Sequence, residues 1–469
     1  MDKRQENKLS PLGKFIEEYK ASDTLRLHMP GHKGRFGYED DLTEIEGADS
    51  LYEAEGIIKA AEDDASAMFC SRRTFLGTEG SSQIIKAMCF LALSRFKAFN
   101  PPDVRPVILA SRNAHKAFIH ASMLLGFDIR WMSGTDSSYS LCKCEIKPEE
   151  LEEYIITLKT DEHNNNRKFA LAAVFVTSPD YLGNTLDIKG LSKAAHRHDT
   201  LLLCDNAHGA YLKFLKEDLH PLSLGADMTS DSAHKTLPVM TGGAFLHISK
   251  NAPEGLERDG KKALLMFGST SPSYPIMQSV AEALKIIAEK SYEDTADKLD
   301  ALKQSLKDMG YTLYGDEPLK VVIDMRKSPM TGPGLSDAFR KQKIECEYSD
   351  PDFLVTMWSP YNRYPEDTDR FIKAAAECLS DYKGTLKEAP EKKALSFKLP
   401  QVRYQPREII YLPHRTCSLD DPVLLGSVAA DALLSCPPAV SPIIAGEVFD
   451  ATIVELLKRY GYKTAEVLI

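Results

Sequence analysis

Short apolar runs alternate with segments of helical periodicity between about residues 60 and 280. Such alternation is typical of buried strands joined by helical crossovers. The predicted strands are Pro106–Ala110, Ala170–Thr177, Leu201–Asp205, Met228–Ser230 and Ala244–Ile248. Apolar residues spaced three to four apart predict helices at Ser82–Phe96, Lys116–Leu125 and Leu191–His198. The pattern therefore predicts an α/β fold with a largely parallel sheet.

The length of the chain predicts one large domain with smaller ones, since 469 residues exceed the about 100–150 of a typical domain. The predicted parts are an N-terminal arm (1–60), a large domain (61–285), a small α/β domain (286–388) and a C-terminal α+β segment (389–469).

Local patterns place these boundaries. A helical stretch, Ser279–Asp308, leads out of the large domain. The small domain is predicted from strands at Lys320–Met325 and Phe353–Met357 and a helix at Asp367–Tyr382. A charged, helix-breaking link at Lys383–Lys393 introduces the last segment.

Composition excludes several classes of protein. Hydrophobic residues make up 43% and charged residues 27%, which is ordinary globular composition. Because there is no secretory signal and no run of about 18 apolar residues, we expect a cytoplasmic protein without a membrane partner. Nine scattered cysteines predict neither a disulfide framework nor a metal site. A net charge of −10 without a basic run disfavours nucleic acid and is compatible with a cationic small molecule.

Polar residues gather directly after three predicted strands, in Arg112–His115, Thr177–Asp180 and Asp205–His208. In open α/β sheets, ligands bind outside the carboxyl ends of the strands. We therefore expect these clusters to converge on one cleft.

Lys235 follows a predicted strand, within Ser232-Ala233-His234-Lys235-Thr236. A lysine amine becomes a Schiff-base nucleophile when it is desolvated or has cationic neighbours. Ser232 and His234 could donate hydrogen bonds to a phosphate while Lys235 points at an aldehyde. The alternative is a solvated lysine beside a loop serine, which this short motif does not exclude.

Asp205 ends the apolar run Leu201–Cys204, so its carboxylate is expected at the carboxyl edge of the sheet. Pyridoxal 5'-phosphate (PLP) needs a carboxylate there, because a charged partner keeps the pyridine nitrogen protonated and makes the ring an electron sink. An Asp that caps the next turn is the alternative. The pairing with Lys235 on a later strand favours the cofactor role.

The segment Gly77–Gln83 opens an amphipathic helix. Free backbone N–H groups and the helix dipole make such a start an anion site. Capping by Ser81 or Ser82 is the alternative. Ser269 and Thr270, in a later loop that enters a helix, could likewise contact a phosphate or cap the helix.

Two histidines follow predicted strands. His115 could stack on an aromatic cofactor or transfer protons, since imidazole titrates near neutrality. His208 presents the same choice. For both residues a structural hydrogen bond is the alternative.

Motifs along most of the chain resemble those of the ornithine/lysine/arginine decarboxylases, which are fold-type I (aspartate-aminotransferase-like) PLP enzymes. The matching strings keep the order and spacing of that family. They are Leu27–Gly34, Leu42–Ile45, Arg112–Lys116, Thr177–Pro179, Asp205–Gly209, Ser232–Thr236, Ser269–Tyr274, Cys436–Pro438 and Gly446-Glu447.

The resemblance implies a large PLP-binding domain with a seven-stranded-type sheet, and a homodimer that shares its cofactor sites. It implies that Lys235 forms the internal aldimine and that Asp205 pairs with the pyridine nitrogen. His208 is implied near the cofactor or the substrate carboxylate, and the loop 269–271 near the cofactor of the other subunit. His115 is expected to stack on one face of the cofactor ring and Ala207 to cover the other. The remaining expected cofactor contacts are Lys235, Asp205, Ser81, Ser82, Gln83, Ser232, His234, Ser269 and Thr270.

The chain departs from the family pattern at three places. Glu79 lies among the small residues of the phosphate segment, and Ile84 stands where a glycine is usual. The usual Asp-Glu-Ala-His is changed at Asn206, and the usual Thr-Ser-Pro-Thr-Tyr at Asp180. Because no receiver-like domain precedes His28, the chain resembles the short form of the family.

The predicted reaction is decarboxylation of arginine, lysine or ornithine, with Lys235, His208 and Asp205 as catalytic residues. Glu447 is the candidate partner of the substrate's distal cation, or else a capping residue. Another PLP reaction, by an aminotransferase or lyase, is the alternative, and Arg403 or Arg407 could then clamp a carboxylate. Retention of Asp205 and Lys235 argues against a catalytically silent binding protein.

Overall fold

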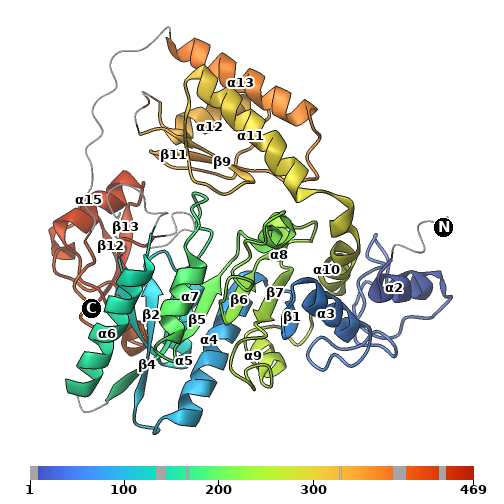
Figure 1. Ribbon diagram of the computed structural model, residues 1–469, viewed down its shortest axis with the longest axis horizontal. Helices are drawn as coiled ribbons and strands as arrows, with labels where there is room; N and C mark the ends of the chain where they lie inside the picture. Colours follow the sequence, from blue (N-terminus) through green and yellow to red (C-terminus); the bar gives the residue numbers. More distant parts are fainter. Residues whose placement is uncertain are drawn as a thin grey trace. The chain divides into compact units, whose positions relative to one another are not determined.

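The computed structural model describes residues 9–133, 144–164, 168–326, 328, 330–383, 398–431 and 440–469 (Figure 1). The chain divides into two compact units. The first comprises residues 1–109, 148–178 and 187–290, and the second 110–147, 179–186 and 291–469. The Cys436–Pro438 motif and most of the link predicted at Lys383–Lys393 lie outside the described residues. The domain boundaries at residues 61, 286 and 389 stay predictions.

A seven-stranded sheet confirms the predicted α/β class, with the strand order β1-β7-β6-β5-β4-β2-β3. Strands β4, β5 and β6 run parallel, while β7 is antiparallel to both β6 and β1. Asp205 at the end of β5 is in register with Ser230, so the segments that follow β5 and β6 leave the sheet at one edge. The strands are β1 (Arg73–Gly77), β2 (Arg105–Ser111), β3 (Asp128–Met132), β4 (Phe169–Thr177), β5 (Leu201–Asp205), β6 (Met228–Asp231) and β7 (Ala244–Ile248).

Helices cover the sheet within the first unit. All residues of β5 and β6 are buried, as expected for interior strands of an α/β sheet. Helix α4 packs against β6, β7 and α9, and α7 packs against β5 (Figure 1). The helices after these strands are α4 (Gly80–Phe99), α6 (Pro148–Asn164), α7 (Ile188–His196), the single turn α8 (Ala233–Thr236) and α9 (Gly260–Met266).

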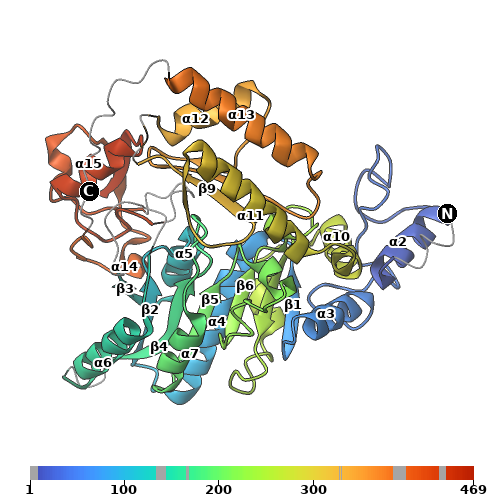
Figure 2. The ribbon, with the colours of Figure 1, turned by 45° about the horizontal axis from the view of Figure 1, so that its top comes forward.

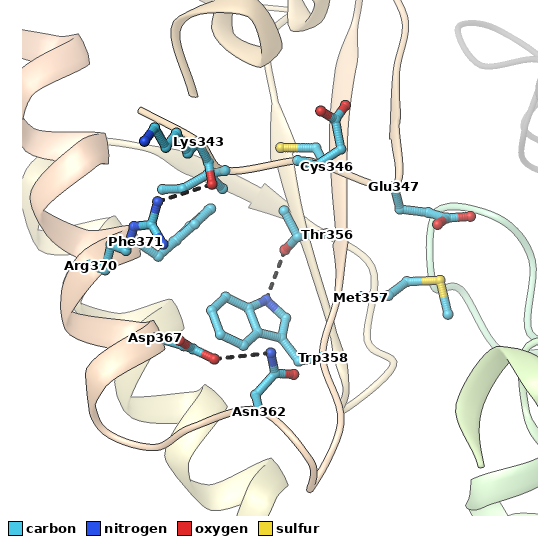
Figure 3. A pocket seen from close by; sticks show the side chains of 12 residues that line it. Lys343, Cys346, Glu347, Thr356, Met357, Trp358, Asn362, Asp367, Arg370 and Phe371 are labelled. Carbon is cyan, nitrogen blue, oxygen red and sulfur yellow. Dashed lines mark hydrogen bonds between the residues drawn. The ribbon is translucent and has the colours of Figure 1, made fainter. Parts of the chain in front are cut away.

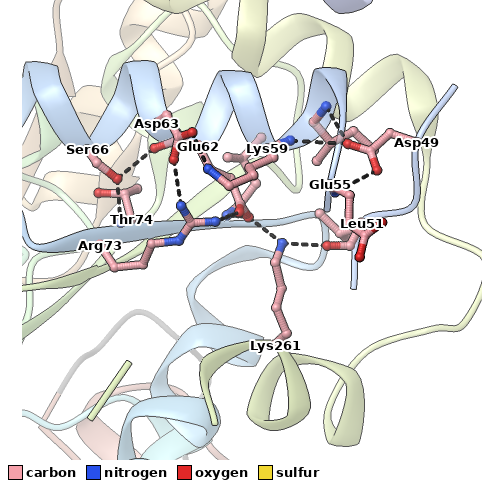
Figure 4. Close-up of polar contacts among 12 residues, drawn as sticks. Asp49, Leu51, Glu55, Lys59, Glu62, Asp63, Ser66, Arg73, Thr74 and Lys261 are labelled. Carbon is pink, nitrogen blue, oxygen red and sulfur yellow. Dashed lines mark hydrogen bonds and ion pairs between the residues drawn. The ribbon is translucent and has the colours of Figure 1, made fainter. Parts of the chain in front are cut away.

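A polar network ties the N-terminal part of the first unit to the sheet (Figure 4). Glu62 of α3 (Ile57–Met68) is buried and accepts hydrogen bonds from Arg73 of β1 (2.7 Å) and Lys261 of α9 (2.5 Å). Burial raises the pKa of Glu62, and Lys261 and Arg73 oppose this. Asp49 caps the start of α3 by accepting the N–H groups of Gly56 (2.8 Å) and Ile58 (2.9 Å). Helices α2 (Pro11–Ala21) and α10 (Tyr274–Ile286) pack against α3.

The helix predicted at Ser279–Asp308 is interrupted. Helix α10 ends at Ile286, and α11 (Tyr292–Met309) begins after Ser291. The side chain of Ser291 accepts the N–H of Asp294 (2.9 Å), which makes it the N-cap of a new helix. The break falls between the two units.

The second unit contains a four-stranded antiparallel sheet with helices α11, α12 and α13 beside it (Figure 2). A two-stranded sheet packs with α15 around the buried side chains of Cys417, Phe449 and Leu457. None of the helices within the described ranges combines the length and apolar character needed to cross a lipid bilayer. The further elements are β8 (Thr312–Tyr314), β9 (Lys320–Asp324), α12 (Gly332–Lys341), β10 (Tyr348–Ser349), β11 (Phe353–Met357), α13 (Glu366–Lys383), α14 (Pro406–Ile409), β12 (His414–Ser418), α15 (Ala451–Arg459), β13 (Thr464–Leu468) and, near the start of the unit, α5 (Lys116–Leu125).

Candidate active site

The three predicted catalytic residues lie in the first unit. Asp205 ends β5, and His208 and Lys235 lie on the segments that follow β5 and β6. Lys235 sits on α8 with an exposed side chain, and its Nζ lies 3.1 Å from Nε2 of His208. Asp205 is 2% exposed, and its Oδ1 accepts the backbone N–H of Ala207 (3.2 Å). Within the described part of the chain this is the one hydrogen bond to the Asp205 carboxylate. The carboxylate therefore keeps acceptor capacity for a ligand.

The charge of Asp205 depends on two opposing effects. Burial raises its pKa to about 6, and the Lys235 ammonium works in the opposite direction. The carboxylate is thus still mainly ionised at neutral pH, although it lies in the protein interior. An ionised carboxylate at this place can hold a protonated ring nitrogen.

The start of α4 offers an anion site. Glu79 is the N-cap residue but makes no capping hydrogen bond, because its carboxylate accepts the N–H of Ser269 instead (2.5 Å). The first N–H groups of this 20-residue helix are therefore not capped by a side chain. A Cβ placed on Gly80, which has φ +68°, would lie 3.7 Å from Cε1 of His234. The helix start and His234 are thus neighbours.

Ser232 adds a hydroxyl to the same region. Its Oγ is buried and has no hydrogen-bond partner within the described residues. A buried hydroxyl without a partner is costly unless a ligand uses it. Together with the α4 start and His234, it fits a phosphate group. These residues come from two segments that the sequence indicated, Gly77–Gln83 and Ser232–Thr236.

Two other predicted contacts have protein partners in the structure. Nε2 of Gln83, a buried side chain, donates to the carbonyl of Leu264 (3.0 Å). The loop at Ser269 is held by Glu79 and by Tyr52, whose hydroxyl donates to the Ser269 carbonyl (3.0 Å). Contacts of Gln83, Ser269 and Thr270 with a cofactor stay predictions, as do those of Ser81, Ser82 and Ala207.

His115 and Glu447 lie in the second unit. Nδ1 of His115 accepts the N–H of Ala117 (3.1 Å) at the start of α5, and its stacking on a cofactor stays a prediction. Glu447 is 1% exposed and makes a bidentate pair with Arg112 (2.6 and 2.7 Å). It also accepts the N–H of Ile444 (2.8 Å). This structural partner was missed from the sequence, and the role of Glu447 toward a substrate stays a prediction.

A cavity of about 410 Å³ lies in the second unit between β11, α13 and the chain before β10 (Figure 3). Two of its charged side chains are engaged by the protein itself. Arg370 donates to the carbonyl of Gln342 (2.7 Å), and Asp367 accepts the N–H of Arg363 (2.9 Å). Its lining therefore identifies no ligand class.

Comparison with known proteins identifies the family. The sequence profile described as "Orn/Lys/Arg decarboxylase, major domain" matches residues 10–312. The chain belongs to the Orn/Lys/Arg decarboxylase family. The match confirms the resemblance that the motifs indicated.

Relatives of this decarboxylase-family chain cover nearly all of it. It is 26% identical to the uncharacterised protein YaaO of Bacillus subtilis (strain 168), over 96% of this chain and 94% of that protein. It is 25% identical to an arginine decarboxylase of the same organism, over 94% and 91%. The Francisella novicida lysine decarboxylase LdcF shares its fold, with a TM-score of 0.78, 17% identity and coverage of 98% of this chain and 81% of that one.

Asp180, where this decarboxylase-family chain departs from the usual Thr, has a local role. Its carboxylate accepts the backbone N–H (2.8 Å) and the side-chain amide (2.7 Å) of Asn184. Burial raises the pKa of Asp180 to about 6, against the effect of these hydrogen bonds. Lys320 donates to the Asp180 carbonyl (3.0 Å), so the substitution is accommodated by a tightly held loop.

Proposed function

We propose that this chain is a PLP-dependent decarboxylase of a basic amino acid, namely arginine, lysine or ornithine. The observation that carries the proposal is the placement of Asp205 and Lys235 on segments that leave neighbouring parallel strands at one edge. Three features suit three different parts of PLP. The carboxylate of Asp205 suits the ring nitrogen, the exposed amine of Lys235 suits the aldehyde, and the start of α4, which no side chain caps, suits the phosphate. Family membership supports the reaction class.

When bound, PLP supplies an electron sink for the pair of electrons left as the α-carboxylate departs as carbon dioxide. Asp205 would hold a proton on the ring nitrogen, because its carboxylate is mainly ionised at neutral pH. Ser232 and the N–H groups at the start of α4 would orient the phosphate. The amine of Lys235 would hold the aldehyde group of PLP.

His208 is the residue best placed to exchange a proton with Lys235, since 3.1 Å separates its Nε2 from Nζ. An imidazole at this distance can accept the proton that the ammonium must lose before it becomes nucleophilic. We infer that the pair supplies and removes protons at the reacting carbon.

The alternative is an aminotransferase or lyase, and an aminotransferase would need an arginine clamp for the substrate carboxylate. The guanidinium of Arg407 donates to Asp128 (2.7 Å), which disfavours it as that clamp. A homodimer that shares its cofactor sites through the loop at Ser269 remains part of the proposal, by the resemblance of that loop to the family motif.

The test is carbon dioxide release from arginine, lysine and ornithine, each supplied separately to the PLP-loaded protein. We expect release from one of them and a visible absorbance band of lysine-bound PLP. Lys235→Ala should abolish the band and lower turnover by about 10³-fold or more. Lys189→Ala, at an exposed lysine of α7, is the matched control and should change neither.

Each failure has a distinct meaning. A wild-type protein without the band refutes the cofactor. Release from none of the three amino acids, with turnover of another amino acid, refutes the substrate class and favours the alternative reaction.

A further inference from the structure

A buried polar bridge joins the two segments that carry Asp205 and Lys235. Asn206 follows Asp205 directly, and Asp231 ends β6 just before α8. Nδ2 of Asn206 donates to Oδ1 of Asp231 (3.0 Å), and the backbone N–H of Asn206 donates to the Ser230 carbonyl (2.9 Å). Both side chains are fully buried. The bridge therefore connects the segments where they leave the sheet, out of reach of water.

His220 and His247 surround the second oxygen of Asp231. The ligand atoms of the three residues lie within 4.8 Å of one another, a spacing that could hold a metal ion. However, Nδ1 of His220 accepts the N–H of Leu222 (3.2 Å), so the ring proton must reside on Nε2. In this tautomer Nε2 donates to Oδ2 of Asp231 (2.8 Å) and has no lone pair for a metal. The amide nitrogen of Asn206 lies 3.0 Å from the same Nε2. The cluster is therefore a hydrogen-bond network.

The network fixes Asp231 as an acceptor on both oxygens. Burial alone would raise the pKa of Asp231, but His220 and His247 hold it well below its usual value. An ionised carboxylate beside position 206 requires a donor there, and the Asn206 amide provides one. The glutamate usual in the family pattern at this position would instead face Asp231 as a like charge in a dry environment.

We propose that Asn206 and Asp231 are positioning residues that hold the carboxylate of Asp205 and the amine of Lys235 at a fixed separation. The bridge acts through the backbone on each side: Asn206 is bonded directly to Asp205, and Asp231 precedes the short turn that ends in Lys235. The use of this geometry for PLP rests on the proposed function. The bridge itself does not depend on the cofactor.

The experiment compares wild type, Asp231→Asn, Asn206→Asp and the reciprocal double variant N206D/D231N, all as full-length protein. Amide hydrogen exchange is followed by mass spectrometry in peptides that cover residues 201–208 and 228–236. Each single variant should exchange at least about tenfold faster in both peptides. An amide at position 231 has one oxygen and cannot accept from both Asn206 and His220, whereas a carboxylate at position 206 would face that of Asp231. The double variant restores a donor opposite an acceptor, and we expect it to return close to wild type.

Thr74→Val is the matched control. Thr74 bonds His247 at the other end of the same network (2.7 Å), and valine keeps its shape while removing the hydroxyl. Exchange should rise around β1 and β7 only. In PLP-loaded protein, Asp231→Asn should shift the pH midpoint of the visible band by about half a unit or more, and Thr74→Val should not.

The inference is overturned if Asp231→Asn leaves both the exchange and the band midpoint unchanged, or if the double variant is no better than the single ones. A wild-type protein without a visible band refutes the proposed function instead. The exchange data then still decide whether the bridge joins the two segments.

Discussion

Two buried carboxylates of this chain, Glu447 and Asp205, have opposite surroundings. Glu447 receives both terminal nitrogens of Arg112 and the N–H of Ile444, so its oxygens are used by the protein. Asp205 receives a single backbone N–H, from Ala207, within the described residues. Both are almost completely buried. The comparison teaches that burial alone does not identify a candidate functional acid, and that burial with few donors makes Asp205 the better candidate.

Removing the charge of Glu447 tests the structural role of this carboxylate and should destabilise the protein. Glu447→Gln removes the carboxylate that forms a bidentate pair with the buried Arg112 guanidinium, and we expect a loss of about 3–5 kcal/mol in the free energy of unfolding. Chemical denaturation measures this loss. Glu345→Gln, which removes a carboxylate from the exposed pair with Arg340, should leave the midpoint nearly unchanged. An equally small effect for Glu447→Gln would remove the distinction between the two acids.

Asp205→Asn should increase the free energy of unfolding at neutral pH, which is the opposite of the effect expected for Glu447→Gln. The pKa of Asp205 in the folded protein, about 6, exceeds the about 3.9 of an unfolded aspartate. The folded state therefore binds this proton more tightly, and its contribution to stability is present below about pH 4 and lost as the pH rises through 6. Cofactor-free Asp205→Asn should be more stable than wild type above pH 6, by up to about 3 kcal/mol.

The measurement is the difference in the free energy of unfolding between the two proteins at pH 4 and at pH 7. Burial also raises the pKa values of Asp180 and Asp350 to about 6. Their contributions to the free energy of unfolding are the same in both proteins and therefore cancel in the difference. The variant should also lose carbon dioxide release. A variant less stable than wild type at pH 7 contradicts the interpretation of Asp205 as an acid kept ready for a ligand.

The smallest expected effect concerns the phosphate. Ser232→Ala removes a buried hydroxyl that has no partner in the described part of the chain, so stability should change little while PLP binds about tenfold more weakly. A fluorescence titration with PLP measures the affinity. Thr229→Val, which removes another buried hydroxyl without a partner in the described structure, is the matched control and should leave the affinity unchanged.

Sequence patterns predicted the elements with strong periodicity. The bounds of β5, β7, β11 and α5 agree with the prediction, because each is a continuous apolar run or a regular amphipathic segment ended by polar residues or glycine. Strand β3 (Asp128–Met132) was missed, since Asp128 and Arg130 interrupt its apolar pattern. The break between α10 and α11 was missed because Ser291 acts through a capping geometry rather than through hydrophobicity.

The site was predictable only in part, for a related reason. Asp205 and Lys235 stand at strand ends, where a local pattern can indicate them. Glu447 pairs with Arg112, which is far away in the sequence, and no local sequence pattern predicts this pair. His220, Asp231 and His247 likewise come from three separate segments. Their only local signal was an aspartate at the end of an otherwise uncharged strand.

The Asn206–Asp231 bridge has a consequence for protein engineering. Stabilisation by consensus replaces an unusual residue with the one most common among relatives, one position at a time. At position 206 that procedure would introduce a glutamate next to a carboxylate that His220 and Asn206 now hold. If the bridge acts as proposed, we expect the two positions to be epistatic, with a change at one tolerated only together with a compensating change at the other.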